Sequence, residues 1–237
     1  MDINWIMGRG LSIDCNLRWE VPAELNVNTE VNIEIIKTLL KEEMKSADTS
    51  IIKKFLDILE SKTKNGFRHR LITTNWDELI EKEIDKKFPI GSHKPYWLTS
   101  SFVYHLNGTI KSEENCNRSP FLLESDDALQ RLASLEANTV LNKIITDKFF
   151  IIVGVSFDCQ TDQDFLNQLS KIEDYLHIGD STWIILNPCS HSLELVSERI
   201  KKALPNSKII LVQQTFSSWI KYSKMKEIVD LNILKAL

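Results

Sequence analysis

The stretch Leu71-Ile72-Thr73-Thr74-Asn75-Trp76-Asp77 joins an apolar run to a helical pattern, as at the carboxyl end of a strand in an α/β fold. Three further polar or glycine-bearing clusters also follow apolar runs of strand type. They are Gly8-Arg9-Gly10-Leu11-Ser12, His105-Leu106-Asn107-Gly108-Thr109 and Val153-Gly154-Val155-Ser156. In an open α/β sheet, ligands bind in the crevice outside the carboxyl ends of the strands. The four clusters together therefore predict one composite nucleotide site.

The hydrophobic periodicity predicts strands that alternate with helices. Strands are expected at residues 3–7, 68–74, 102–106, 149–155, 182–186 and 208–212. Helices are expected at residues 32–45, 46–62, 77–87, 126–147, 163–177, 190–203 and from 216 onward. This alternation predicts a doubly wound, Rossmann-like α/β fold, in which a parallel sheet of about six strands has helices on both faces. We expect a single domain over residues 1–237, with residues 32–62 as a candidate small helical cap over the site.

The composition is ordinary for a soluble globular protein and argues against several classes of function. A formal net charge of −4 gives no basic character for binding nucleic acid. The four cysteines form no C-x-x-C pair, which argues against a zinc ribbon and a disulfide framework and fits the cytoplasm. No apolar run approaches the roughly 18 residues that a membrane span needs. We therefore expect no metal, nucleic acid or membrane as a partner.

Gly8 and Gly10 stand directly after the first expected strand. Glycines at this position let backbone N–H groups approach a phosphate closely. The third glycine of a G-x-G-x-x-G motif is missing, because Ile13 occupies its position. A tight turn that merely needs glycine explains the pair equally well. Arg9, which separates the two glycines, has a side chain long enough either to reach a phosphate or to crowd the turn.

Taken together and in order, these clusters resemble the motifs of the sirtuin superfamily, particularly of its zinc-free bacterial sirtuin-like branch. That family carries a G-A-G-x-S loop after its first strand, a T-x-N-x-D motif, an H-G motif and a late G-x-S motif. Residues 8–12 are similar to the first motif, and residues 73–77 match the second in full. Residues 151–157 are similar to the last motif. Residues 15–19 resemble the segment that covers the cofactor, and residues 184–188 resemble the strand whose end approaches the adenosine.

The resemblance implies that the protein binds NAD⁺ and cleaves its nicotinamide–ribose bond. In the bacterial branch the acceptor is often water, and the enzyme destroys NAD⁺ during phage defence. Asn75 would hold the nicotinamide ribose or a water, which suits an amide because it offers donors and an acceptor without charge. Asp77 would orient Asn75 or cap the following helix. The resemblance places the other cofactor contacts at Gly8, Arg9, Gly10, Ser12, Trp19, Thr74, Gly154, Ser156 and Asn187.

The chain departs from the family pattern at the catalytic histidine, because Asn107 precedes Gly108 where the family has histidine. Asparagine cannot act as a general base near pH 7, whereas histidine titrates there. His105 stands two residues earlier and points to the same face if the strand continues, with the two Cα atoms roughly 6–7 Å apart. His105 is therefore either the displaced catalytic group or a packed residue at the end of a strand. The catalytic candidates are Asn75, Asp77, His105 and Asn107.

Three hypotheses follow for the function. The first is an NAD hydrolase of the bacterial defence type. The second is a catalytically degenerate module that binds NAD or ADP-ribose and acts through a partner protein. The third is an interaction protein on a degenerate nucleotide fold, in which residues 126–147 and 216–237 pack against a partner or a second copy. We favour the sirtuin-like NAD-binding protein that cleaves NAD, which the resemblance implies, and keep the degenerate binding module as the alternative.

Overall fold

The computed structural model describes residues 2–18, 20, 22, 30–63, 68–88, 103–106, 149–158, 160–176 and 181–221. The predicted site residues Trp19 and Asn107 lie outside the described residues. So do the helix expected at 126–147 and the expected helical tail beyond Lys221.

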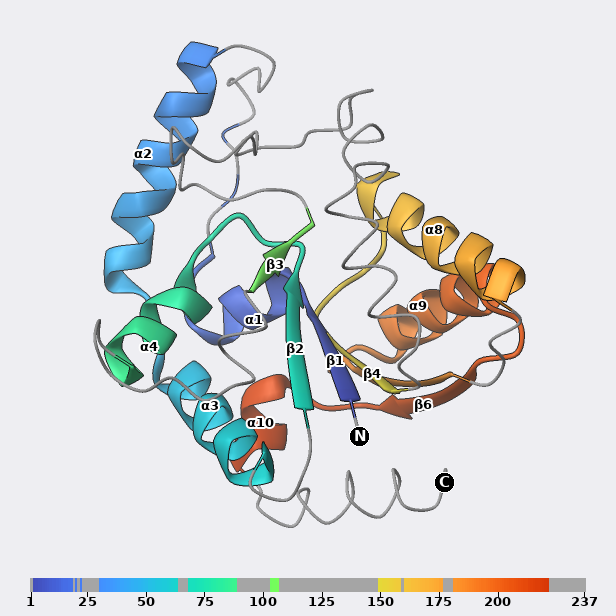
Figure 1. Ribbon diagram of the computed structural model, residues 1–237. Coiled ribbons are helices and arrows are strands. Elements are labelled where there is room, and N and C mark those ends of the chain that lie inside the picture. Colours follow the sequence, from blue (N-terminus) through green and yellow to red (C-terminus); the bar gives the residue numbers. More distant parts are fainter. Residues whose placement is uncertain are drawn as a thin grey trace.

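Within the described residues, six strands form one parallel sheet in the order β3-β2-β1-β4-β5-β6 (Figure 1). The strands are β1 (Asp2–Met7), β2 (Arg68–Thr73), β3 (Tyr104–His105), β4 (Phe149–Val153), β5 (Thr182–Leu186) and β6 (Lys208–Val212). The direction of winding reverses between β1 and β4. Such a reversal is the topological switch point at which doubly wound sheets bind nucleotides. The predicted Rossmann-like α/β sheet is confirmed.

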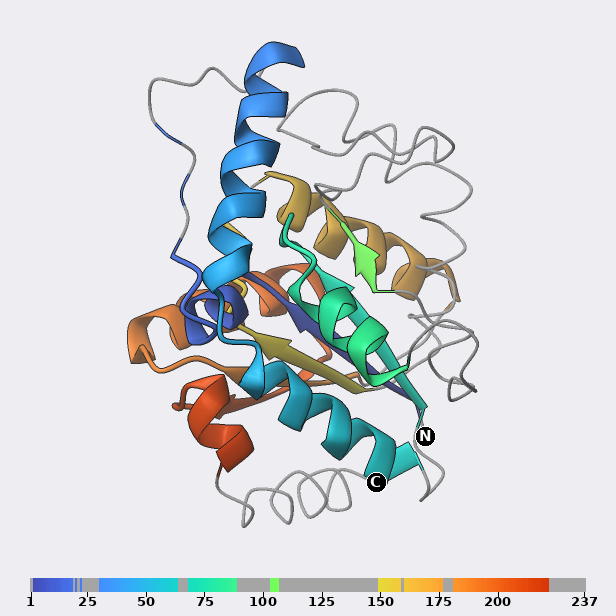
Figure 2. The same ribbon diagram turned by 90° about the vertical axis from the view of Figure 1, so that its left-hand side faces the viewer.

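Helices cover both faces of the sheet (Figures 1 and 2). One face carries α1 (Arg9–Asp14), α3 (Ser50–Thr63), α4 (Leu79–Lys87) and α10 (Phe216–Lys221). The other face carries α8 (Gln160–Leu176) and α9 (Ser190–Ala203). Successive residues of a strand point to opposite faces, so Trp5 and Met7 pack with the first group of helices and Ile6 packs with the second.

The core consists of two apolar layers, one on each face of the sheet. In the first layer the ring of Trp5 lies 4.8 Å from that of Phe55 of α3 and 5.7 Å from that of Trp219 of α10. In the second layer Phe150 and Trp183 stack at 4.2 Å. Every residue of β4 and β5 is buried, because both strands are central and covered on both faces. This double burial explains the unbroken apolar runs of their sequences.

The segment expected as a helical cap, residues 32–62, comprises two helices with different positions. The side chains of Ile52, Phe55 and Leu59 of α3 are fully buried against the sheet. In contrast, α2 (Glu30–Ser46) stands beyond the carboxyl ends of β1 and β2 (Figures 1 and 2). Its buried residues Leu40 and Met44 lie one helical turn apart and hold it to the rest of the protein. Only α2 therefore lies next to the site described below.

Two predicted boundaries differ from the structure for local physical reasons. The strand expected to reach residue 155 ends at Val153, because Gly154 adopts a left-handed conformation with φ of 61° and turns the chain. The helix expected from residue 77 begins at Leu79, because Asp77 accepts a hydrogen bond from the backbone N–H of Leu79 in the preceding turn. Both changes lie at the carboxyl end of the sheet, one after β4 at the switch point and the other after β2, which is the neighbour of β1.

Candidate nucleotide site

Three glycines bring two turns into direct backbone contact at the switch point. The N–H of Gly8 donates to the carbonyl of Val153 at 2.9 Å, and that of Gly10 donates to the carbonyl of Gly154 at 3.1 Å. A Cβ atom at Gly10 would lie 2.6 Å from the Cα of Gly154, and one at Gly154 would lie 2.4 Å from the Cα of Gly10. These positions therefore require glycine because the two turns pack without space for a side chain.

A cavity of about 450 Å³ opens above this contact, at the carboxyl ends of β1, β2 and β4. Its walls come from α1 and the segment after it, from the turn at residues 74–77, from the loop at 154–156, from Leu40 of α2 and from Asp162 of α8. The volume lies within the range of about 300–1,000 Å³ that is usual for small-molecule sites. The structure thus brings together side chains from both halves of the doubly wound sheet.

Asn75 is held at the cavity wall by two hydrogen bonds from its side-chain amide. Its Nδ2 donates to the carbonyl of Gly8 at 3.1 Å and to Oγ of Ser12 at 2.8 Å. A carbonyl oxygen can only accept, so the contact with Gly8 fixes which amide atom is the nitrogen. No contact among the described residues uses Oδ1 of Asn75. The amide therefore presents an acceptor to a ligand in the cavity.

Asp77 completes a buried chain of hydrogen bonds that starts at Asn75. Oγ of Ser12 accepts from Asn75 and donates to Oδ2 of Asp77 at 2.6 Å, while the N–H of Leu79 donates to Oδ1 of Asp77 at 3.3 Å. Asp77 thus contacts Asn75 through Ser12 and accepts from Leu79 in the turn before α4, whereas the N-cap position of that helix is Glu78. Burial raises the pKa of Asp77 above its usual range, although the hydrogen bonds from Ser12 and Leu79 oppose the shift.

His105 lies behind Asn75 and does not line the cavity. Its Nδ1 is 2.8 Å from the backbone carbonyl of Asn75, and its Nε2 is 2.5 Å from Oε1 of Glu81 on α4. The side chain is only 8% exposed. Burial lowers the pKa of His105, but the hydrogen bond and charge of Glu81 outweigh burial and raise that pKa above its ordinary value.

The loop between β4 and α8 forms the opposite wall of the cavity. Ser156 lines the cavity and is exposed, and its backbone carbonyl accepts a hydrogen bond from Arg199 of α9. Arg199 also pairs with the carboxylate of Asp158. Phe157 adopts φ of 55° with its ring fully buried, an uncommon conformation for a bulky residue. Two contacts thus hold the loop: the buried ring of Phe157 and the hydrogen bond from Arg199 of α9.

An ion pair between Arg9 and Glu20 stands at the mouth of the cavity. Both side chains line the cavity, and their exposed fractions are 58% for Arg9 and 72% for Glu20. An exposed pair of this kind is held weakly, because water screens both charges. Arg9 is therefore available to an anionic ligand that competes with Glu20.

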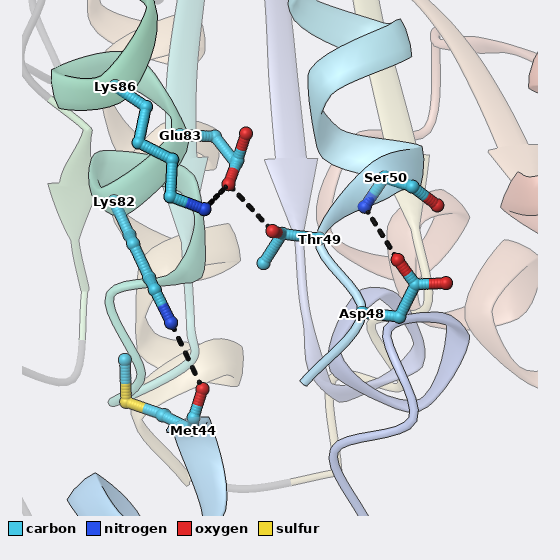
Figure 3. Close-up of polar contacts among 7 residues, drawn as sticks. All are labelled: Met44, Asp48, Thr49, Ser50, Lys82, Glu83 and Lys86. Carbon is cyan, nitrogen blue, oxygen red and sulfur yellow. Dashed lines mark hydrogen bonds and ion pairs between the residues drawn. The ribbon is translucent and has the colours of Figure 1, made fainter. Parts of the chain in front are cut away.

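Polar contacts tie the turn between α2 and α3 to α4 (Figure 3). The hydroxyl of Thr49 donates to Oε1 of Glu83 at 2.6 Å, and Nζ of Lys86 donates to the same oxygen at 2.5 Å. Nζ of Lys82 donates to the carbonyl of Met44 at the end of α2, at 3.2 Å. These contacts fix α2 relative to the element that follows Asn75 and Asp77, so Leu40 is held beside the cavity.

Several residues predicted as cofactor contacts do not line the cavity. Gly8 and Gly10 lie beneath it, and their N–H groups bond to protein carbonyls. Asn187 follows β5, where its Oδ1 accepts from the N–H of Cys189 before α9. The predicted residues that do line the cavity are Arg9, Ser12, Thr74, Asn75, Asp77, Gly154 and Ser156.

Other lining residues were not predicted individually from the sequence, although Leu17 lies in the segment at residues 15–19 that was expected to cover the cofactor. Trp76, Leu17 and Leu40 supply apolar surface, and Asp162 and Glu20 supply carboxylates. Trp76 lies inside the T-x-N-x-D motif. An aromatic residue among these polar neighbours is a sequence signal that could have identified it as a site residue. Leu40 carries no signal, because an apolar residue on an amphipathic helix is indistinguishable from core.

No group of three or more His, Cys, Asp or Glu side chains in the described ranges is placed to hold a metal ion. None of the helices in that part of the chain is long and apolar enough to cross a membrane. Cys15, in the segment that follows α1, is buried, and burial raises the pKa of its thiol to about 12. It therefore offers no thiolate at neutral pH.

The sheet order and the cavity at the switch point are those of a Rossmann-like nucleotide-binding protein. The family model of the SIR2-like domain matches residues 69–204, which is more than half of the chain. The chain belongs to the SIR2-like domain family, whose domains bind NAD, and the sirtuin-like assignment is confirmed. The match includes Asn75, Asp77 and His105, whereas the loop of Gly8 and Ser12 precedes it. A comparison with curated proteins found no match.

Proposed function

We propose that this protein binds NAD⁺ in the cavity at the switch point and hydrolyses its nicotinamide–ribose bond. Water supplies the acceptor oxygen, so the products are nicotinamide, ADP-ribose and one proton. The observation that carries the proposal is the connected set of Asn75, Ser12 and Asp77, which presents one amide oxygen at the cavity wall. A neutral acceptor in a fixed position suits a ribose hydroxyl or the attacking water.

The residues around the cavity fit a dinucleotide in their chemistry. Arg9 at the mouth offers a cation to a pyrophosphate, and the ring of Trp76 offers a flat apolar surface to a nicotinamide or adenine ring. Asn75 and Ser12 offer polar groups to a ribose. Thr74, Gly154 and Ser156 line the same cavity, which supports the proposal that they contact the ligand. Gly8 and Gly10 take part by holding the two turns together.

The proposed rate contribution of Asn75 comes from positioning and electrostatics. Asn75 enters the cavity on a turn fixed at both ends, because its N–H donates to Oγ1 of Thr73 at 3.0 Å and its carbonyl is held by His105. Preorganised groups of this kind lower a barrier without reorganising during the reaction. Hydrolysis is therefore possible without a general base, but it is expected to be slow, since such a base is typically worth about 10²–10⁴-fold.

The experiment is incubation of purified protein with NAD⁺, followed by separation of nicotinamide and ADP-ribose. Asn75→Ala is expected to abolish nicotinamide release. The matched control is Asn206→Ala, because Asn206 is an exposed asparagine in the turn between α9 and β6, at the amino end of the sheet. Release that is equal in the two variants would refute the proposal, provided that both melt at the temperature of the wild-type protein.

A second candidate function is a module that binds NAD or ADP-ribose without cleaving it. Asn107 at the family histidine position favours this candidate, as does His105, whose two ring nitrogens are both engaged with protein oxygens. Titration calorimetry that detects binding of NAD⁺ or ADP-ribose, in a protein with no nicotinamide release, would favour the module. Such a module would act through a partner protein or a second copy, which sedimentation would detect.

The proposed biological setting is the cytoplasm of a bacterium under attack by phage. It rests on the resemblance to the zinc-free bacterial branch and is tested in cells. Bacteria that produce the wild-type protein are expected to lose NAD⁺ after phage infection, and those that produce the Asn75→Ala variant are expected to keep it. Equal NAD⁺ levels in both strains after infection would contradict this setting.

A further inference from the structure

We infer that His105 is a positioning residue whose imidazolium ring holds the backbone of Asn75, and that it is not the general base. This inference deepens the proposed function and rests on it for the identity of the ligand. It assigns a role to His105 in a site that has asparagine at position 107, where the family has histidine.

The partners of His105 fix the hydrogens on its ring. Nδ1 faces the carbonyl oxygen of Asn75 at 2.8 Å, and a carbonyl oxygen can only accept a hydrogen bond. Nε2 faces Oε1 of Glu81 at 2.5 Å, and an ionised carboxylate likewise only accepts. When the carboxylate of Glu81 is ionised, both ring nitrogens act as donors, which describes the imidazolium form. A ring in this form has no lone pair with which to take a proton from water.

The ring also lies on the wrong side of Asn75 for proton transfer in the cavity. His105 is absent from the cavity wall, whereas Asn75 is part of it. The contact joins the ring to the main chain of Asn75, and the side-chain amide of Asn75 faces Gly8 and Ser12 instead. His105 therefore acts on the site by fixing the turn that carries the amide.

The charges around the ring favour the cationic form. Among the described residues, the titratable groups that face His105 are Glu81 of α4 and Asp77 of the turn before that helix. Oε2 of Glu81 is buried and has no hydrogen-bond partner among those residues, so His105 is the cation that compensates this carboxylate. The hydrogen bond and the charge of Glu81 raise the pKa of His105 above its ordinary value in spite of burial, which favours the protonated ring.

This arrangement predicts the opposite pH dependence from that of a general base. A base must lose its proton to act, so activity would rise with pH through its pKa. A positioning imidazolium holds Asn75 while it keeps its proton, so activity is expected to fall as pH rises above about 6.5 and through the raised pKa of His105. Stability is expected to change with pH in the same direction. A group with a raised pKa contributes its full stabilisation below its unfolded-state pKa, and this stabilisation is lost above its folded-state pKa.

The test compares His105→Ala with the double variant His105→Asn/Glu81→Gln. An asparagine amide lies near the position of Nδ1 and keeps a donor for the carbonyl of Asn75, but it neither titrates nor accepts a proton. Replacing Glu81 at the same time avoids an uncompensated buried carboxylate. We expect the double variant to stay within about threefold of wild-type kcat/KM at pH 6.5 with a flat pH profile, and His105→Ala to lose at least tenfold. A double variant as inactive as His105→Ala would overturn the inference.

A second measurement does not depend on NAD⁺ chemistry. Histidine labelled with ¹³C and ¹⁵N reports the protonation of each ring by NMR, and the His105→Asn/Glu81→Gln variant assigns the signal of His105 among the five histidines. An imidazolium signal at pH 7 supports the inference, and a neutral ring overturns it. An imidazolium ring in a protein that neither binds nor cleaves NAD⁺ would keep the assignment of the ring and refute the proposed function instead.

Discussion

Replacing Gly10 by alanine should destabilise the protein, although the same change in most helices stabilises it. Gly10 lies in α1, and a glycine in a helix usually costs about 1 kcal/mol relative to alanine. Here the added Cβ would lie 2.6 Å from the Cα of Gly154, where ordinary contacts are 3.4–4 Å. The obstacle is backbone that is also hydrogen-bonded to Gly10, so no side-chain rotation relieves it.

The expected magnitude follows from these two opposing terms. Overpacking costs about 1–3 kcal/mol, and the rigid backbone neighbour places Gly10→Ala near the upper limit. Subtracting the gain of about 1 kcal/mol in helix propensity leaves a net loss of about 2 kcal/mol. For a domain of this size, each kcal/mol lowers Tm by about 2–4 °C, so the expected decrease is about 4–8 °C. Gly154→Ala should cost more, about 4 kcal/mol, because φ of 61° adds about 1 kcal/mol of strain and no helix propensity is gained.

The assay is thermal unfolding followed by circular dichroism, with Ile13→Ala as the control. Ile13 lies in the same helix but is 41% exposed, so its truncation should change stability by no more than about 0.5 kcal/mol. A Gly10→Ala variant that melts at or above the wild-type temperature would refute the packing argument. If that variant also lost its affinity for NAD⁺, the glycine would be required for contact with a phosphate instead.

Three further predictions concern the polar groups of the site. Ser12→Ala should lower the free energy of unfolding in urea by about 1–3 kcal/mol, because it removes the donor to buried Asp77; an unchanged value would contradict the hydrogen-bond chain. Burial raises the pKa of Asp77 above 3.8, so its contribution to stability is complete below that value and is lost as pH rises through the folded pKa. Wild type should therefore gain stability relative to Asp77→Asn between pH 7 and pH 4, and a constant difference would show that this pKa is not raised. Glu20→Gln should remove the ion pair of Arg9 and tighten NAD⁺ binding by up to about fivefold, as measured by calorimetry at low salt. If the gain in affinity persists at about 0.5 M salt, the ion pair is not its cause.

The fold was predictable because its signals are local and repeated. Strands such as β4 and β5 are buried on both faces and therefore appear in the sequence as unbroken apolar runs. The polar cluster that follows each strand then indicates where the ligand site lies. Sequence reasoning could not separate α2 from α3, because both are amphipathic helices with similar spacing. Their different positions depend on packing against α4 and the sheet, which is tertiary information.

The candidate site was predictable in its residue types but not in its contacts. The motif at 73–77 indicates an amide and a carboxylate at the end of β2, and the structure adds that Ser12 of α1 connects them. That link joins residues 63 and 65 positions apart, so no local pattern contains it. For the same reason the sequence places His105 on the correct strand without revealing that Glu81 and the carbonyl of Asn75 occupy its two nitrogens.

Different groups hold the side chain and the main chain of Asn75, and this arrangement explains how a site can form with asparagine at position 107. The side-chain amide of Asn75 is oriented from below by Gly8 and Ser12, and its main chain is held from behind by His105. These contacts exist in the protein before any ligand binds, so the cost of ordering the site is met during folding. Under the proposed function, chemistry then depends on fixed dipoles and on the positioning of the attacking water, and the missing base lowers the rate without removing the site.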